Sequence, residues 1–240
     1  MARTHAKGTD ILIDEFSFTG ISNSVGIDIA NGNAEVTAFA DTAATYAEGK
    51  PATNITVNAV YQVAEDAALF AVLGEATDNY LSISPAAMAD GGIVWITKAH
   101  LTGDTIPTPF DSAVTLNATW AGTDPIGDGV ILERDTNITS TVTGAAVQQG
   151  AVSSTQKIMC FLHVISAAGG TLDVTIQSDN GAGFGSPTTR LTFAQVTSTA
   201  GAWVATANGA ITDDYWRCVA TAGGGSPVYN IAVTFAIIPL

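Results

Sequence analysis

Charged residues are scarce in this chain, and basic residues are the scarcest. Only 12% of the 240 residues are charged, against ~25% in an average soluble protein, and 8 Lys and Arg face 22 Asp and Glu. The net charge of −14 argues against electrostatic binding of free nucleic acid. The low charge also excludes a long coiled coil, and the 47% content of hydrophobic residues excludes disorder.

Cysteine, histidine and long apolar runs are also few. Cys160 and Cys218 are too few for a disulfide framework, and since both lie in apolar runs, free buried thiols are expected rather than a bridge. His5, His100 and His163 accompany no Gly-x-Ser-x-Gly elbow and no clustered acidic ligand set. No run reaches the ~18 apolar residues of a membrane helix. The sequence therefore predicts no enzyme activity, metal site, cofactor or membrane span.

Alternation of apolar and polar residues predicts strands along most of the chain. Residues 54–63 place Ile55, Val57 and Ala59 on one face and Asn or Thr on the other, which is typical of a half-buried strand. Three runs are apolar on both faces and predict central or covered strands: residues 91–101, 158–165 and 231–238. Clusters of Gly, Asn, Asp and Pro separate the runs, so the predicted fold class is all-β.

One segment, residues 64–73, predicts a helix. Glu65 and Asp66 lie in its first turn, where the helix dipole favours acids, and Gly74 follows as a stop. Leu69, Phe70 and Leu73 are expected to form its buried stripe.

The distribution of charge suggests two domains. Residues 1–140 hold 18 acidic and 5 basic residues, a net charge of −13, whereas residues 141–240 hold 4 and 3. Residues 139–150 have few bulky apolar side chains and are interpreted as a linker or an inter-domain strand. The second domain is expected to be a small β-sandwich, Ig-like or jelly-roll-like.

An ordered set of features extends through the first domain. A polar arm (2–8) precedes a strand (10–18), a hairpin-like segment (21–29), the segment 34–51 with Val36-Thr-Ala-Phe-Ala-Asp41, a strand (55–63), the short helix and a last strand ending at 129–133. In this order they resemble the tail tube (major tail) proteins of long-tailed, siphophage-type bacteriophages. Residues 141–240 resemble the β-sandwich modules that such virion proteins carry outside.

The resemblance implies a structural protein of the virion tail, assembled in the host cytoplasm. It implies a tail-tube-like β-sandwich or barrel over residues 1–140, and hexameric rings that stack into a tube through which DNA passes without specific binding. The partners would be other copies of the chain and the tape-measure, terminator and distal tail proteins.

Candidate site residues follow from the resemblance and the charge. Asp28, Glu35 and Glu133 are candidates to line an acidic lumen that repels phosphates; solvated surface acids are an equal alternative. A long loop at residues 41–51 and the basic arm are expected to contact neighbouring subunits, through Arg3, His5, Lys7, Asp41, Tyr46, Glu48 and Lys50.

A second hypothesis is a virion decoration or host-attachment protein whose C-terminal β-sandwich binds carbohydrate. Trp203 and Trp216 would then be exposed for sugar stacking, whereas core aromatics are the more common outcome in strands.

Overall fold

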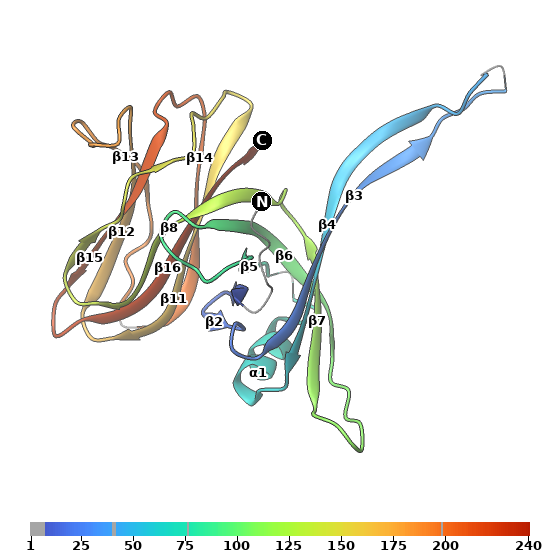
Figure 1. Ribbon diagram of the computed structural model, residues 1–240, viewed down its shortest axis with the longest axis horizontal. Helices are drawn as coiled ribbons and strands as arrows, with labels where there is room; N and C mark the ends of the chain where they lie inside the picture. Colours follow the sequence, from blue (N-terminus) through green and yellow to red (C-terminus); the bar gives the residue numbers. More distant parts are fainter. Residues whose placement is uncertain (1–7, 40–41, 76, 198) are drawn as a thin grey trace. The chain divides into compact units, whose positions relative to one another are not determined.

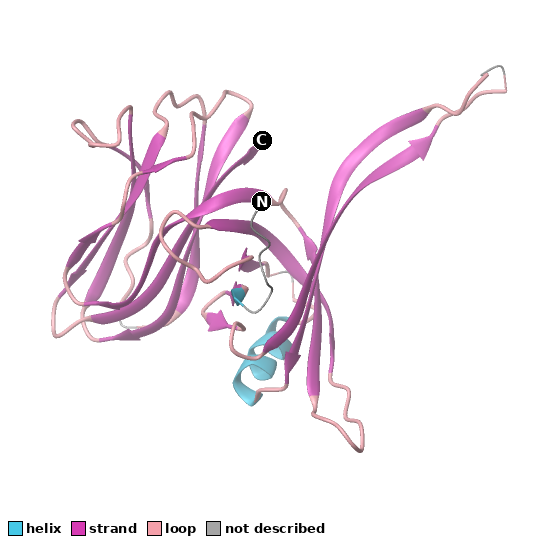
Figure 2. Ribbon diagram, viewed as in Figure 1, coloured by secondary structure: helices cyan, strands magenta, loops and turns pink. Residues whose placement is uncertain are grey.

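The computed structural model describes residues 8–39, 42–75, 77–197 and 199–240 (Figure 1). Strands dominate and one α-helix is found among these residues (Figure 2), so the predicted all-β class is confirmed. The chain divides into two compact units. Unit 1 contains the described residues up to Gly20 together with Asn79–Thr97 and Ile126–Leu240, and unit 2 contains Ile21–Asp78 and Lys98–Pro125.

Unit 1 is a β-sandwich with an added layer. Its strands are β1 (Asp10–Ile13), β2 (Phe16–Ser17), β5 (Asn79–Ser84), the start of β6 (Ile93–Thr105), β8 (Gly127–Ile138), β9 (Thr141–Thr143), β10 (Val147–Gln148), β11 (Gln156–Ala168), β12 (Thr171–Asp179), β13 (Thr188–Thr192), β14 (Gly201–Asn208), β15 (Tyr215–Gly223) and β16 (Val228–Pro239). One sheet runs β14-β11-β16-β8 and on through β6 and β5 to β1 and β2. The other runs β10-β15-β12-β13, with β9 on β15.

The main core lies between the two sheets of unit 1. Leu162 and Val164 of β11 belong to the same buried cluster as Ile176 of β12. Trp216 of β15 packs on Phe235 of β16, with ring centroids 4.8 Å apart. Each fully buried side chain of this size contributes roughly 1.5–3 kcal/mol through removal of apolar surface from water.

The opposite faces of β11 and β16 are buried too. Met159 and Phe161 of β11 join Leu12 of β1 and Ala236 of β16 in a second cluster. The apolar runs 158–165 and 231–238 therefore form central strands covered on both faces, as their lack of alternation predicts.

Unit 2 is a four-stranded sheet with a helix. Its elements are β3 (Ser22–Glu35), β4 (Tyr46–Val60), α1 (Val63–Val72), the rest of β6 and β7 (Thr115–Gly122), and its strand order is β3-β4-β7-β6. Ile55, Val57 and Ala59 of β4 are buried beside Leu116 and Trp120 of β7. The alternation read from residues 54–63 is confirmed.

The predicted boundary at residue 140 does not separate the two units. β8 pairs antiparallel with β16, from Gly129↔Ala236 to Ile138↔Tyr229, so residues on both sides of the boundary share one sheet. The predicted linker contributes β9 and β10, both paired with β15. The charge distribution does not determine strand pairing, which depends on backbone register and buried faces.

The long loop predicted at residues 41–51 is shorter in the structure. Residues 46–51 belong to β4 and pair with the end of β3, from Glu35↔Tyr46 to Asn31↔Pro51. Alanine-rich sequence without core-sized side chains gives no strand signal, yet cross-strand backbone hydrogen bonds hold it extended.

The helix forms one residue earlier than predicted and faces differently. Gly74, just after its end, has φ +83°, the conformation expected of a glycine stop. Leu69 is buried as predicted, but Phe70 is 72% exposed, so its assignment to the buried stripe is wrong. Phe70 follows Leu69 directly and therefore points about 100° away from it around the helix axis.

Candidate functional site

The most unusual feature of unit 2 is the β3–β4 hairpin, which runs beyond its own sheet (Figure 1). β7 pairs with β4 only from Asn54 to Val60. The remaining eight residues of β4, Tyr46–Thr53, pair with β3 alone, which is about 26 Å of two-stranded ribbon at ~3.3 Å per residue. A two-stranded ribbon without further strands is only marginally stable in water, so packing against another surface would stabilise it.

The ribbon carries a built-in irregularity. The register between β3 and β4 shifts between Asn31 and Asn33, and a Cβ built on Gly49 would overlap the carbonyl oxygen of Gly32. Only glycine permits this approach, since any side chain at residue 49 would separate the two strands.

Exposed apolar side chains are spaced along the ribbon. Ile29, opposite Thr53, lies at its base, whereas Val36, Phe39 and Tyr46 lie toward its far end; all four are exposed. The backbone there is ordered locally, because Val36 N–H donates to Thr45 O at 2.8 Å. Exposed apolar groups on an ordered projecting hairpin are characteristic of an interaction surface.

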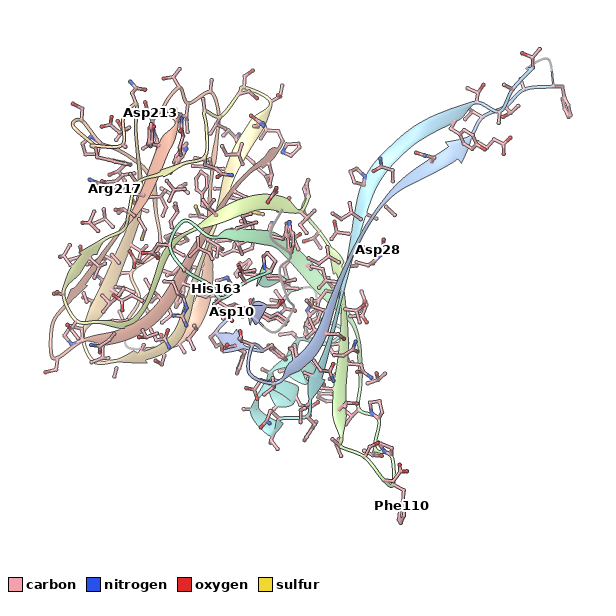
Figure 3. The ribbon with its side chains drawn as sticks, in the orientation of Figure 1. Asp10, Asp28, Phe110, His163, Asp213 and Arg217 are labelled. Carbon is pink, nitrogen blue, oxygen red and sulfur yellow. The ribbon has the colours of Figure 1, made fainter. Side chains whose placement is uncertain are left out.

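A second group of exposed apolar residues lies at the opposite end of β4. Val63 and Phe70 of α1 are 71% and 72% exposed, and Phe110 of the β6–β7 loop is fully exposed. Figure 3 shows Phe110 at the outer end of that loop, pointing away from unit 2. The Tyr61 N–H donates to Val114 O at 3.1 Å, which ties the loop to the segment that leads into α1.

The inward side of α1 is acidic instead. Tyr61 donates its O–H to Asp66 Oδ2 at 3.3 Å. Burial, and then the Asp66 carboxylate, raise the pKa of Asp104 on β6. The helix thus buries Leu69 and brings the Asp66 carboxylate to Tyr61, while Val63 and Phe70 stay exposed.

The face of the unit 2 sheet opposite its buried face is polar and nearly uncharged. Asp28 of β3 pairs with Asn54 of β4, and Asn58 donates to Ser24 Oγ at 2.8 Å. Asp28 and Glu35 are both exposed, and Figure 3 shows Asp28 on β3. Both carboxylates are therefore accessible to solvent, as a lumen or an ordinary surface would require.

The predicted contact residues can be followed only in part. Arg3, His5, Lys7 and Asp41 lie outside the described residues. Glu48 and Lys50 belong to β4, and Tyr46 is an exposed residue at its start.

Glu133 cannot line a channel, because it is buried. It lies on β8 with 4% of its surface exposed, and its Oε2 has no hydrogen-bond partner among the described residues. A Cβ on Gly144 would stand 3.0 Å from this oxygen. Burial, and then the charges of Asp90 and Asp135, raise the pKa of Glu133 to about 7. The lumen assignment of Glu133 is wrong; strand alternation alone did not reveal that the loop around Asp90 and the segment after β9 cover it.

The two tryptophans proposed to stack on sugars are not exposed platforms. Trp216 is fully buried in the unit 1 core, and its indole N–H donates to Gly150 O at 2.9 Å. Trp203 packs against the same core. The sugar-binding role proposed for Trp216 is therefore wrong, and the second hypothesis retains only Trp203, which is half-buried.

His163 is a structural residue held in a hydrogen-bonded chain. Nδ1 lies 2.7 Å from Asp14 O, and because a carbonyl only accepts, Nδ1 carries the hydrogen. Nε2 then accepts from Ser82 at 2.8 Å, and Ser82 accepts from Thr234 at 2.9 Å. Burial lowers the pKa of His163 to about 4, so it is neutral near pH 7.

Other chemistry is sparse in the part of the chain that the structure describes. Cys160 and Cys218 are free and buried, as predicted. No group of three His, Cys, Asp or Glu residues in the described ranges is placed to hold a metal ion. No helix of residues 8–39, 42–75, 77–197 and 199–240 is long and apolar enough to cross a membrane.

Sequence reasoning missed the exposed aromatics Phe39, Phe70 and Phe110. A signal was available for Phe39 and Phe110, which stand in segments with few other large apolar residues. An aromatic residue without apolar neighbours in sequence has little chance of entering a core.

Comparisons with known proteins give distant likenesses. No family model matches the sequence, and no curated protein matches it. Among solved structures, the chain is similar to a chain in the virion of a native gene transfer agent particle, with a TM-score of 0.41 and 11% identity over 52% of this chain and 97% of that one. It is also similar to the Dit protein of phage SPP1, described as a hub adsorption apparatus of phages that infect Gram-positive bacteria. The TM-score is 0.39 and the identity 13%, over 96% of this chain and 99% of that one. A third similar structure is a chain in the sheath–tube complex of the extracellular contractile injection system PVC. The TM-score is 0.39 and the identity 17%, over 52% of this chain and 89% of that one. All three scores lie below 0.5, so none of these proteins assigns a function to this chain.

Proposed function

We propose that this chain is a self-assembling structural protein of a phage-type tail. Copies join side by side into rings, six per ring by the sequence resemblance, and the rings stack into a tube for DNA. The observation that carries the proposal is the β3–β4 hairpin, whose outer half extends beyond its sheet and exposes Val36, Phe39 and Tyr46.

Ring formation is supported by the borders of the unit 2 sheet. Among the described strands, β3 pairs only with β4, so its other edge offers unpaired backbone groups, an exposure that proteins normally cover. β6, the last strand of the β3-β4-β7-β6 order, continues into unit 1, where it pairs with β8 and β5. Pairing of the β3 edge with another copy would extend the sheet and cover these groups.

The polar face of the same sheet suits a channel for DNA. Its side chains are mainly Asn, Ser and Thr, and Asp28 adds a negative charge. Asp28 repels phosphates, and neutral polar side chains lack the positive charge that dominates DNA binding, so DNA would slide. In this proposal Asp28 and Glu35 are lumen candidates, and Arg3, His5 and Lys7 pair with acids of a neighbouring copy.

Electron microscopy of the purified chain tests the proposal. Closed rings that stack into open tubes are the expected result. A monodisperse monomer at every concentration, up to the solubility limit and across ionic strengths, would reject it. Rings that never stack would retain ring assembly and reject the tube.

The channel assignment has its own test in tubes assembled from the Asp28→Lys variant. If Asp28 lines the lumen, the variant tubes should retain short double-stranded DNA at low salt, whereas wild-type tubes do not. Asp173→Lys on the exposed face of β12 is the matched control. Equal retention by both variants would place Asp28 outside the channel.

A further inference from the structure

The chain contains three Asn-Gly pairs, each of which is chemically capable of deamidation. They are Asn31-Gly32, Asn180-Gly181 and Asn208-Gly209, and all three asparagines are exposed. In this reaction the backbone nitrogen of the glycine attacks the side-chain amide carbon of the asparagine. Glycine favours the attack because it has no Cβ beside the nitrogen and permits the backbone rotation that the attack needs. The sequence therefore offers three sites of equal chemistry, and their structural settings differ.

Two of the three pairs are held in β-ladders. Asn31 of β3 pairs with Pro51 of β4. Asn208 is the last residue of β14, and the Gly209 N–H donates to Gln156 O at 2.9 Å. In an extended strand the glycine nitrogen reaches the asparagine side chain only if the backbone of the asparagine rotates. Because this rotation would break cross-strand hydrogen bonds, both pairs are protected by the fold.

Asn180 lies in the turn that follows β12. Its side chain makes no hydrogen bond to another residue of the described ranges, so the amide is free to rotate. The Gly181 N–H donates to Asp179 Oδ1 at 3.0 Å, which makes Asn180 the central residue of an Asx-turn. The nitrogen that must attack therefore already directs its hydrogen at a carboxylate, a base that can accept it.

We infer that Asn180 is the site at which the folded chain deamidates. Gly181 N attacks the amide carbon of Asn180, its proton passes to the Asp179 carboxylate, and the new C–N bond closes a succinimide ring. The bond between that carbon and the side-chain nitrogen breaks, and the nitrogen leaves as ammonia with the proton from Asp179. Water, the only co-reactant, then adds to either ring carbonyl and opens the ring to aspartate or isoaspartate.

The product alters the loop between β12 and β13 in charge and in backbone length. Each reacted chain gains a carboxylate next to Asp179. Isoaspartate also inserts a methylene group into the backbone before Gly181, which removes the spacing of the Asx-turn. The same loop carries Phe184, whose ring centroid lies 4.2 Å from the Arg217 guanidinium carbon. Isoaspartate at residue 180 should therefore loosen the packing of Phe184 on Arg217.

Peptide mapping of aged, unassembled protein tests this site. The three asparagines lie in three different tryptic peptides, so mass spectrometry follows the conversion of each amide to an acid separately. In folded protein at pH 8 we expect Asn180 to react at least tenfold faster than Asn31 or Asn208. In the chain unfolded in urea the three rates should converge, because the ladders that protect the other two pairs are gone.

Matched variants test the attacking nitrogen and the base. A Cβ on Gly181 or on Gly183 meets nothing within 4 Å, so valine fits at either position. Gly181→Val places a branched side chain beside the attacking nitrogen and should slow the loss of Asn180 at least tenfold, whereas Gly183→Val should leave it unchanged. Asp179→Asn keeps an acceptor for the turn but supplies no base, and it should slow the reaction at least threefold.

Each measurement has a result that would overturn the assignment. Equal rates at the three asparagines in folded protein, or a preference for Asn180 that persists in urea, would mean that the fold does not select the site. An unchanged rate in Gly181→Val would exclude attack by Gly181 N, and an unchanged rate in Asp179→Asn would exclude Asp179 as the base. All of these measurements use unassembled protein, so their failure would leave the proposed function standing.

Discussion

Replacing Glu133 by glutamine should stabilise the protein at neutral pH and leave its stability unchanged in acid. The carboxyl group is 4% exposed, its Oε2 lacks a partner among the described residues, and its pKa is raised to about 7 from an ordinary value of 4.5. The amide of Glu133→Gln has nearly the same shape and carries no charge. The variant therefore removes the cost of an ionised, buried group with little change in packing.

The magnitude follows from proton linkage. Between pH 4.5 and 7 the folded chain binds one more proton at Glu133 than the unfolded chain, so stability from this group is full below pH 4.5 and is lost as the pH rises through 7. A difference of 2.5 pKa units at 1.36 kcal/mol each gives about 3 kcal/mol. Glu133→Gln should thus exceed wild type by about 3 kcal/mol at pH 7.5 and match it at pH 4.5.

Urea unfolding of unassembled protein measures this difference. The free energy of unfolding of both chains is determined by circular dichroism at pH 4.5, 5.5, 6.5 and 7.5. Subtracting the wild-type value at each pH cancels every group the chains share. Asp173→Asn, at an exposed position of β12, is the matched carboxyl-to-amide control.

The reasoning is refuted by either of two results. A stability difference that is the same at all four pH values would mean that Glu133 titrates alike in the folded and unfolded chains. A difference that grows as the pH falls would mean that the folded structure stabilises the carboxylate.

Three further predictions concern His163, Trp216 and Gly49. Because burial lowers the pKa of His163 to about 4 from 6.5, the unfolded chain binds more protons between these values, and His163 should remove about 3 kcal/mol of stability from pH 7 to pH 4. A His163→Gln chain should lack this loss when its urea unfolding is compared with that of wild type, and parallel pH profiles of the two chains would contradict the prediction. Trp216→Ala should cost about 3–5 kcal/mol by opening a core cavity, measured by the same unfolding, and a loss below 1 kcal/mol would show that unit 1 does not depend on it. Gly49→Val should abolish the stacking of rings in electron micrographs without changing the main unfolding transition, because the clash with Gly32 is confined to the ribbon. The control is Gly225→Val, where a Cβ meets nothing within 4 Å. Normal stacks from Gly49→Val would argue against a role for the ribbon.

The amino-acid sequence determined the local structure of this protein. Period-two alternation in residues 54–63, two-sided apolar runs at 158–165 and 231–238, and Gly74 after the helix each specify an element through interactions within a few residues or through the need to bury one face or two. The free, buried state of Cys160 and Cys218 followed from the same apolar runs.

Only the tertiary structure decided which residues are buried and which are available. Glu133 was expected to be exposed and is buried, whereas Phe70 was expected to be buried and faces solvent. Exposure depends on segments distant in sequence that cover a position or leave it open. The division into units was hidden for the same reason, since β8 pairs with β16 across about a hundred residues. The exposure of Phe39 and Phe110 likewise depends on the folded chain, because no other segment among the described residues covers them.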